Sequence, residues 1–559
     1  MAVAGGGAFT AIATGAFDGP APDRFANMPR SLALSLPKTA GSTGLPVPPL
    51  TDPLAEGHVT APSASARIPY ARNAPDPRLV EKDIPTTLPF AFNKTGYQML
   101  PDLPEHLRPW RDRPTSWANT SLKSGPYHLN SQGVYLYYPN GGSVGYDHPV
   151  GQIQFGLGCI TSYRIEKDPA RRAVFLKRAK QQADRLIEKR VETRGAWYFP
   201  YPFNYGNPAH GTNYKAPWYS GMSQGEAISL FAQLAQLEGV GEADRVRYKA
   251  AADGAFSSLL RAENAFPWVV NKDRAGYLWI QEYPYSTPGK GDYTYNGMIF
   301  AVFGVWDYYQ LTGNELAAEL YDGVLTTVAR YFPLLRNPRR FSYYCQNHRL
   351  GSDSYHPHHI HLWQQLHWQT NSAVFANQLD QLMDDVPPSG VKPGSVIAIA
   401  KGSHTLYKVA STPSGDYDRA GDDKILGTKK VTFARPTQAP ADKRRRIQGA
   451  GIWYRISAGA YKGWWIGEAW PNVFLRGEHM PVTYRTQRTL TVPANTPVEA
   501  YAFGTEGVAG TVKTLKYSEP FTAQFDRRSI INGRAMCHIS SGEFADHWVP
   551  ANQVITDGR

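Results

Sequence analysis

The stretch NGMIFAVFGVWDYYQLTG, residues 296–313, decides the fold that this sequence predicts. Its apolar residues recur at helical spacing, which predicts a helix. Three tyrosine-bearing segments flank it along the chain: YLWIQEYPYS around Tyr283, FSYYCQNH around Tyr344 and SYHPHHIHL around Tyr355. A helix at this point can hold the flanking segments on one rigid frame. Tyrosine, glutamate and histidine each donate or accept protons, so we expect an active site between Tyr277 and Leu366.

The composition bounds the class of protein. With 559 residues the chain is too long for one ordinary core, which favours two or three domains. Hydrophobic residues make up 42% and no apolar run is long enough to span a membrane, so a globular, soluble protein is expected. Aromatic residues reach 13%, with 33 Tyr and 14 Trp, a surplus that suits sugar stacking or ordinary core packing.

The cysteines and the net charge indicate which kinds of site and partner the protein can have. Three cysteines, Cys159, Cys345 and Cys537, are too few and too scattered for a disulfide framework or a zinc site. The formal charge is +12, and residues 391–559 carry 23 Lys and Arg against 14 Asp and Glu. This surplus favours an anionic partner such as acidic polysaccharide, teichoic acid, nucleic acid or a membrane surface. A solvated basic surface without a partner is the alternative.

The N-terminal part, residues 1–90, is rich in Pro, Gly, Ala, Ser and Thr and predicts an extended or disordered leader. Its first residues are mildly apolar but have no positively charged flank, so they are at best a truncated export remnant. A secreted or envelope-associated location is therefore an expectation only.

The middle of the chain predicts helices, over residues 149–168, 168–191, 223–241, 242–263, a pair within 295–331, and 359–382. Ser223 and Glu226 form a capping-box pattern at the start of one of them, with Gly239 as its stop. An aromatic loop, residues 197–219, separates two helical pairs. This repeated rhythm predicts an (α/α) toroid whose inner helices surround a cleft. An α-solenoid would need a fixed sequence period, which is not found.

The last part of the chain contains a repeat of β pattern after PPSGVKP, residues 387–393. Residues 442–466 match residues 526–549 at a spacing of 83 to 84: Ile447, Gly449, Ile456, Gly459, Tyr461 and Trp465 correspond to Ile531, Gly533, Ile539, Gly542, Phe544 and Trp548. The pattern predicts two tandem small β-barrels and resembles bacterial Src-homology-3-like wall-binding modules. We therefore expect a multidomain α+β protein with a leader (1–90), a toroid (91–386) and two β-barrel repeats (391–478 and 482–559).

Five ordered sequence blocks carry a resemblance to a known family: YYPNGGSVGYDHPVGQIQFGL, WYSGMSQGEAIS, QEYPYS followed by the helix quoted above, FSYYCQNH, and SYHPHHIHLWQQL. Residues 132–370 resemble the catalytic domain of the glucuronyl 5-epimerases, which convert D-glucuronate to L-iduronate in heparosan-type polymers. The resemblance implies an isomerase that acts on an anionic uronate-containing polysaccharide rather than nucleic acid. A cell-wall polymer is a further expected partner of the basic repeats.

The resemblance also implies the catalytic residues Glu282, Tyr283, Tyr344 and Tyr355. Glu282 and Tyr355 are expected to move the proton on opposite faces of the sugar, while Tyr283 and Tyr344 stabilise the developing charge. Burial would raise the pKa of Glu282 for this role. No redox cofactor is required, and no Gly-rich dinucleotide fingerprint is visible.

Substrate-binding residues are expected around this set: His356, His359, His348, Arg349, Trp218, Tyr219, Gln224 and Asn296. The family has an acidic residue and an arginine–histidine pair where this chain has Cys345 and then Asn347 and His348, and Arg349 is a substitute for that arginine. Gln224 and Asn296 suit either sugar hydroxyls or helix caps. The histidines of HPHHIH suit structural or substrate contacts better than a metal site.

Two other functions stay open from the sequence. A polysaccharide lyase removes the same hydrogen and then expels the substituent at carbon 4. A glycan-binding protein without catalysis would bind the polymer unchanged. If the repeats only tether the enzyme, removing residues 391–559 should spare catalysis on soluble substrate.

Overall fold

The computed structural model of the protein describes residues 90, 93, 96–104, 107, 128–207, 212–261, 265–273, 276–287, 290–351, 355–410, 425–447, 450–503 and 509–557. The predicted leader lies outside these residues except for Phe90. The fold is α+β, and the chain forms two compact units. In the described residues, the first unit runs to Leu335 and includes Tyr344–Leu350. The second comprises Arg336–Tyr343 and the residues from Gly351 onward.

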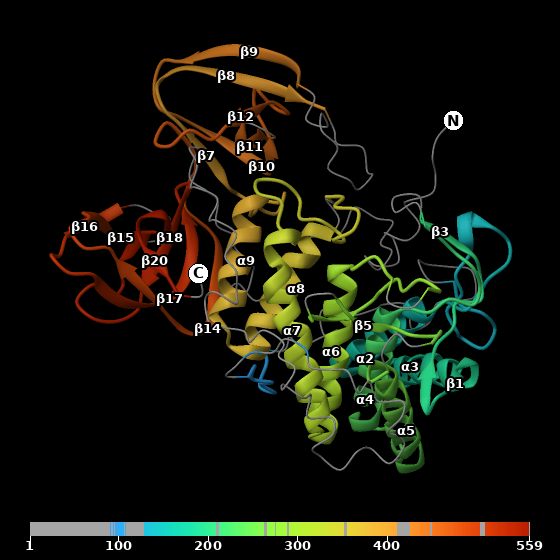
Figure 1. The fold of residues 1–559 in the computed structure, drawn as a ribbon. Helices are drawn as coiled ribbons and strands as arrows, with labels where there is room; N and C mark the ends of the chain where they lie inside the picture. Colours follow the sequence, from blue (N-terminus) through green and yellow to red (C-terminus); the bar gives the residue numbers. More distant parts are fainter. Residues whose placement is uncertain are drawn as a thin grey trace. The chain divides into compact units, whose positions relative to one another are not determined.

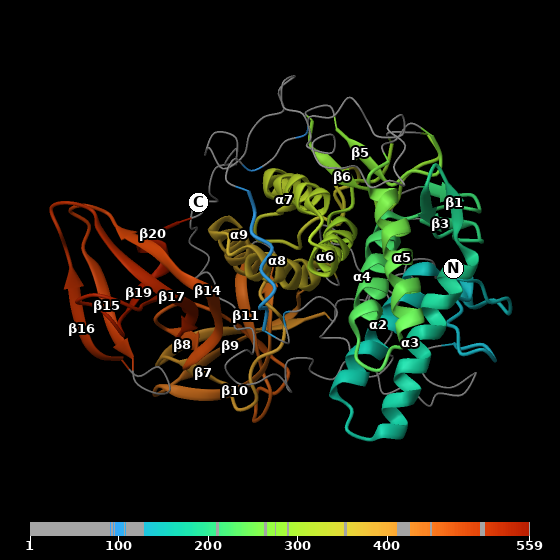
Figure 2. The same ribbon diagram turned by 90° about the horizontal axis from the view of Figure 1, so that it is seen from below.

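Helices dominate the first unit and follow one another in pairs. Its described residues form α2 (Pro149–Ile165), α3 (Pro169–Lys189), α4 (Gly221–Gln236), α5 (Glu242–Leu259), α6 (Tyr295–Thr312) and α7 (Glu315–Leu335). Figures 1 and 2 show α2, α4 and α5 side by side. The first helix of each pair is buried along most of its length, whereas the second keeps an exposed face. The predicted helix pair within 295–331 is confirmed by α6 and α7.

Small residues let α4 and α6 approach closely. A Cβ built on Gly225 would lie 2.2 Å from the Cα of Ala301, and one on Gly304 would lie 1.8 Å from the carbonyl oxygen of Gly225. A larger side chain does not fit at either position, because the neighbouring atoms belong to the backbone and cannot move aside. The two glycines therefore fix the spacing of these two largely buried helices.

Three short two-stranded ribbons connect the helices: β1 (Val191–Thr193) with β2 (Ala196–Tyr198), β3 (Tyr205–Asn207) with β4 (Thr212–Tyr214), and β5 (Val270–Lys272) with β6 (Leu278–Ile280). The ribbon of β3 and β4 lies within the aromatic loop predicted over residues 197–219, and the ribbon of β1 and β2 lies at the start of that loop. The 3₁₀ turn η5 (Pro139–Gly141) precedes α2.

Two helix predictions are wrong in detail. The capping box fails because α4 begins at Gly221 with Ser220 as its N-cap, so Ser223 and Glu226 lie inside the helix. The single helix predicted over 359–382 is two helices, α8 (Tyr355–Thr370) and α9 (Ala373–Asp385). Asn371 adopts a φ of 55° between them, a left-handed conformation that ends a helix.

The second unit contains α8, α9 and two seven-stranded antiparallel sheets (Figure 1). The first sheet comprises β7 (Val396–Ile399), β8 (Gly402–Val409), β9 (Ile425–Phe433), β10 (Thr437–Ile447), β11 (Gly451–Ile456), β12 (Trp465–Gly467) and β13 (Val473–Leu475). The second comprises β14 (Glu478–Val492), β15 (Val498–Phe503), β16 (Ala509–Leu515), β17 (Phe521–Ile531), β18 (Arg534–Ile539), β19 (Trp548–Pro550) and β20 (Ile555–Thr556).

The two sheets repeat one topology. The first has the strand order β13-β7-β10-β11-β12-β8-β9, and the second, read from its other edge, has β20-β14-β17-β18-β19-β15-β16. Each strand of the first sheet corresponds to the strand seven places later in the chain. Two residue pairs matched in the sequence, Ile447 with Ile531 and Trp465 with Trp548, lie in equivalent small apolar clusters of the two sheets. The internal repeat therefore extends from sequence to topology.

The compact units divide the chain differently from the predicted domain ranges, because α8 and α9 belong with the sheets. The boundary near residues 387–393 stays a prediction about domain organisation. Among the described residues, no helix is both long enough and apolar enough to cross a membrane.

Candidate active site

Glu282 lies two residues after the end of β6, on a segment that hydrogen bonds of Gln281 hold in place. The Gln281 side chain donates to Asn271 Oδ1 at 2.8 Å and accepts from the Tyr293 backbone N–H at 2.9 Å. The Gln281 carbonyl accepts from the Gly221 N–H at 2.7 Å, at the first residue of α4. Glu282 therefore sits on backbone that is tied to the start of α4.

The Glu282 carboxyl is buried against the first turn of α6. A Cβ built on Gly297 would lie 2.2 Å from Glu282 Oε2 and 2.6 Å from its Cδ. The Tyr344 hydroxyl donates to both carboxyl oxygens at 3.3 Å. Burial raises the pKa of Glu282 to about 8, although hydrogen bonds from Tyr283 and Tyr344 lower it in part. A carboxyl with this pKa can hold or release a proton near neutral pH.

Tyr344 is placed by the segment that pairs with the start of α6. The Tyr295 N–H donates to the Tyr344 carbonyl at 3.2 Å, and the Gln346 N–H donates to the Tyr293 carbonyl at 3.1 Å. Thr294 and Cys345 form an antiparallel bridge between these two pairs. The structure thus brings the Glu282 and Tyr344 side chains together, and their catalytic roles stay predictions.

Several polar side chains at the start of α6 are buried near the turn against which the Glu282 carboxyl packs. Thr294 Oγ1, the Tyr295 hydroxyl and both amide atoms of Asn296 have no hydrogen-bond partner within the described residues. Asn296 is 0% exposed, and burying an unpaired amide costs free energy. An amide in this state can bind a polar group of a ligand, which suits the predicted substrate-binding role of Asn296.

The aromatic loop packs against Tyr283 and forms a wall of stacked rings. The Tyr283 ring centroid lies 6.3 Å from those of Tyr205 and Trp218, and 5.8 Å from that of Tyr214. Trp218 stacks on Tyr201 at 3.8 Å and donates from its indole N–H to the Phe203 carbonyl at 2.9 Å. These rings therefore bury most of their surface against one another. Tyr205, which is half-buried, keeps more ring surface accessible than Trp218.

Two of the predicted sugar-binding residues have packing contacts. Tyr219 is buried with its ring against Tyr198 and Phe266. The Gln224 amide accepts from the Phe199 N–H at 3.0 Å and donates to the Trp197 carbonyl and to Ser258 Oγ. Gln224 thereby ties α4 to the aromatic loop and α5. The sugar-binding roles of Tyr219 and Gln224 stay predictions.

Glu226 is a buried acidic residue of α4 that the sequence reasoning assigned to a helix cap. Its Oε1 accepts from Gln154 Nε2 of α2 at 2.9 Å. Its charge, like that of Glu282, raises the pKa of the buried Tyr201 hydroxyl, although desolvation is the larger cause. The Tyr201 hydroxyl accepts from the Val150 N–H at the start of α2. A charged residue inside the apolar pattern of SQGEAISLF was the available signal for this second buried carboxyl.

The positions that depart from the family pattern have local structural roles. The Cys345 thiol accepts from the His348 N–H at 3.4 Å and lies 3.3 Å from His348 Nδ1. Burial raises the pKa of Cys345 to about 12, so the thiol stays protonated. Asn347 donates to the Gly291 carbonyl at 2.7 Å. Arg349 is exposed, and its charge partly offsets the rise in the pKa of Tyr295 that burial causes.

Tyr355, His356 and His359 belong to the second unit, on the first turns of α8. All three are buried. Ser342 connects the two histidines: its hydroxyl lies 2.9 Å from His356 Nδ1 and 2.7 Å from His359 Nδ1. The Ser342 N–H also donates to His356 Nδ1 at 3.0 Å. Burial lowers the pKa of His356 to about 4 and that of His359 well below its usual value, so both rings are neutral.

No group of three or more His, Cys, Asp or Glu that could hold a metal ion occurs in the described part of the chain. Both ring nitrogens of His356 are engaged within the protein. The HPHHIH run therefore contributes hydrogen bonds to Ser342 and to backbone in this structure.

Part of this chain matches a known protein family. Residues 192–383 match the family described as "D-glucuronyl C5-epimerase C-terminus". This range contains Glu282, Tyr283, Tyr344 and Tyr355. A comparison with curated proteins gave no match.

Comparison with solved structures gave only distant matches. An unsaturated glucuronyl hydrolase from Streptococcus agalactiae has 16% identity and a TM-score of 0.29, over 43% of this chain and 57% of that chain. A GH76 α-mannanase from Bacteroides thetaiotaomicron has 14% identity and a TM-score of 0.29, over 46% of this chain and 63% of that chain. The chain thus spans little more than half the length of the first of these structures.

Proposed function

We propose that the protein inverts carbon 5 of glucuronate residues within a polysaccharide, because residues 192–383 match the D-glucuronyl C5-epimerase C-terminus. The product is L-iduronate, formed by removal and return of one hydrogen. The observation that carries the proposal is the buried Glu282 carboxyl, whose pKa is raised to about 8 and which accepts from the Tyr344 hydroxyl. A base tuned in this way suits proton abstraction from carbon near neutral pH.

Glu282 is the proposed base in the first step. The hydrogen on carbon 5 is weakly acidic because the neighbouring carboxylate already carries charge. In its ionised form Glu282 takes this proton, and the electron pair of the C–H bond moves into the carboxylate to form an enediolate. Burial of Glu282 lowers the competition from water for its lone pairs and strengthens its basicity.

Hydrogen-bond donors near Glu282 are proposed to stabilise the enediolate. The Tyr344 hydroxyl is already directed at the Glu282 carboxyl, and the Tyr283 hydroxyl also hydrogen bonds to it. The Asn296 amide, which is buried without a partner among the described residues, is available to the sugar carboxylate. The start of α6 adds a partial positive charge, which favours an anion at this position.

Tyr355 is the proposed acid that returns a proton to the opposite face of carbon 5. The phenol must be neutral to donate, and its oxygen becomes a phenolate after the step. Inversion follows because removal and return occur on different faces. Exchange of both groups with solvent then restores a carboxylate at Glu282 and a phenol at Tyr355.

The domain architecture, the polymer substrate and the location of the protein are also proposals. We propose that α2 to α9 form an (α/α) toroid, since buried and half-exposed helices alternate along the chain, and that each β repeat is a small barrel. A heparosan-type polymer is the proposed substrate. A cell-wall polymer as partner of the repeats, and secretion, remain predictions. Arg444, Arg446, Arg488 and Arg528 are buried, so much of the basic surplus lies inside the protein.

The test is incubation of the protein with heparosan and other uronate polymers in heavy water, followed by NMR of carbon 5. We expect deuterium at carbon 5 in an intact chain. Glu282→Gln and Tyr355→Phe should each abolish this exchange while polymer binding persists. Tyr308→Phe is the matched control, because that hydroxyl hydrogen bonds to Asp253 in the helical core.

Other outcomes identify the other functions. Chain shortening with a new ultraviolet absorbance from an unsaturated product would show a lyase. Polymer binding with no exchange across the panel would show a glycan-binding protein without catalysis. Exchange at the wild-type rate in the Glu282 and Tyr355 variants would overturn the assigned residues.

A further inference from the structure

We propose that the two C-terminal sheets are part of the catalytic machinery: they fix α9, and α9 fixes His356, which positions Tyr355. This inference rests on the proposed function, because it takes Tyr355 as the acid. His356 acts through its neighbour and is a positioning residue. Every contact that carries the inference lies within the second unit.

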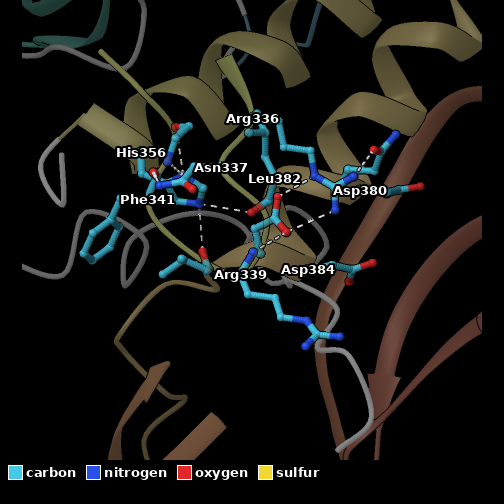
Figure 3. Close-up of polar contacts among 12 residues, drawn as sticks. Arg336, Asn337, Arg339, Phe341, His356, Asp380, Leu382 and Asp384 are labelled. Atoms are coloured by element: carbon cyan, nitrogen blue, oxygen red, sulfur yellow. Dashed lines mark hydrogen bonds and ion pairs between the residues drawn. The ribbon is translucent and has the colours of Figure 1, made fainter. Parts of the chain in front are cut away.

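The neighbours of the His356 ring can act only as hydrogen-bond donor or only as acceptor, and they hold the ring in one tautomer. Its Nε2 lies 3.0 Å from the carbonyl oxygens of Leu382 and Val386, at the end of α9 (Figure 3). Carbonyl oxygens only accept, so Nε2 carries the hydrogen. Its Nδ1 accepts from the Ser342 N–H, which only donates. The neutral ring therefore spans α9 on one side and Ser342 on the other.

The end of α9 also fixes the segment that bears Ser342. The Arg336 guanidinium pairs with the Asp385 carboxylate at 2.6 Å, and the Arg339 N–H donates to the same carboxylate at 2.9 Å. Figure 3 shows Arg336, Arg339 and His356 converging on this end of the helix. Both neighbours of the His356 ring thus depend on the position of α9.

The second sheet fixes α9 through buried charges. Asp380 accepts from the Tyr484 hydroxyl at 2.9 Å and pairs with Arg488 at 3.2 Å, both from β14. One turn further along α9, Asp384 pairs with Arg528 of β17 at 2.8 Å. These groups are mostly buried, so the contacts have fixed geometry rather than the mobility of surface ion pairs.

The first sheet and α8 complete the arrangement. Arg446 of β10 donates to the Asp384 carbonyl at 2.7 Å. At the far end of α8, His367 Nε2 accepts from the Arg485 N–H at 3.0 Å, so β14 holds α8 as well. Both sheets therefore contact the helices that carry the Tyr355 segment. A flexible tether would not need buried pairs of this kind.

The experiment measures coupling without relying on activity alone. Hydrogen–deuterium exchange of backbone amides in the first turns of α8 is compared between wild type, Asp384→Asn and the control Asp442→Asn. Asp442 pairs with Arg455 within the first sheet at an exposed site. We expect at least tenfold faster amide exchange at 355–360 in Asp384→Asn and no change in Asp442→Asn.

Turnover then tests the role of His356 itself. His356→Leu removes the hydrogen bonds at both ring nitrogens, whereas His356→Gln keeps one donor and one acceptor at a similar separation. We expect kcat for carbon-5 exchange to fall at least tenfold in His356→Leu with KM within twofold, and to recover largely in His356→Gln. A loss in KM alone, or equal loss in both folded variants, would overturn the positioning role.

Failure of the two proposals can be told apart. If wild type shows no exchange at carbon 5, the proposed function fails, while the amide measurement still tests whether the sheets fix α8. If Asp384→Asn leaves amide exchange at 355–360 unchanged, the coupling is overturned even when the enzyme is active. If Asp384→Asn does not fold, the same amide comparison between His356→Leu and His356→Gln decides the last link of the coupling.

Discussion

The carboxyl of Glu282 occupies the space that a side chain at position 297 would need. A Cβ on Gly297 would lie 2.2 Å from Glu282 Oε2, well inside van der Waals contact. The glycine therefore lets the acid approach the first turn of α6. This relationship makes the position of the proposed base sensitive to a single methyl group on a neighbouring helix.

Gly297→Ala should displace Glu282 and reduce carbon-5 exchange by about 100-fold, since a shift of about 1 Å in a catalytic group has effects of this size. Overpacking should also cost about 1–3 kcal/mol of stability. Rates at saturating polymer and thermal unfolding measure the two effects. Gly427→Ala is the control, because a Cβ there has no neighbour within 4 Å. An unchanged rate in Gly297→Ala would contradict the tight placement of Glu282.

The raised pKa of Glu282 predicts a specific dependence of stability on pH. The folded protein holds this proton up to about pH 8, whereas an unfolded glutamate releases it near its usual pKa of 4.5. Between these values the native state binds more protons than the unfolded state, so its stability falls as pH rises. Glu282→Gln should remove this part of the slope, which is at most about 1.4 kcal/mol per pH unit. Denaturant unfolding of both proteins at several pH values checks it, and parallel curves would exclude the raised pKa.

The sequence predicted features that depend on periodic or repeated patterns. The apolar period placed α6 and α7, and the 83–84 residue spacing gave the shared strand order of the two sheets. A short pairing with residues 293–295 brings Tyr344 beside α6, and the contact with Glu282 follows from this pairing rather than from a sequence pattern.

Features that depend on contacts between residues far apart in the chain could not be predicted from the local sequence pattern. Ser223 and Glu226 matched a capping box, but the helix begins two residues earlier, and Glu226 turns inward to Gln154. The basic surplus of residues 391–559 suggested a basic surface, yet Arg444 and Arg446 of β10 donate to the Pro388 and Asp384 carbonyls. Local composition does not reveal that such partners exist elsewhere in the fold.

Tyr344→Phe should shift the pH dependence of catalysis. The Tyr344 hydroxyl stabilises the ionised form of Glu282, so its loss should raise the pKa of Glu282 further. A hydrogen bond to a charged group is worth about 1.5 kcal/mol or more, which corresponds to about 1 pH unit. The rising limb of the exchange rate should therefore move to higher pH by about that amount.

The pH–rate profile of Tyr308→Phe, whose hydroxyl also donates to a carboxylate but at Asp253, should overlay the wild type. A Tyr344→Phe profile that falls in rate without moving along the pH axis would assign Tyr344 to the substrate rather than to Glu282. Both variants retain the ring, so packing changes little.

Removal of residues 391–559 should unfold α8 and α9 rather than spare catalysis, contrary to the expectation of a simple tether. The deletion takes away Tyr484, Arg488 and Arg528, which leaves Asp380 and Asp384 without their partners. Losing one partner of a buried pair costs about 3–5 kcal/mol, a large share of the stability of about 5–15 kcal/mol that is usual for a protein. The truncated chain should therefore be poorly soluble and cleaved quickly by protease between residues 351 and 386. Adding Asp380→Leu and Asp384→Leu to the same truncation should restore part of the soluble yield, because the unpaired charges are gone. A plain truncation that resists protease and exchanges carbon 5 as fast as the full chain would show that the sheets are dispensable.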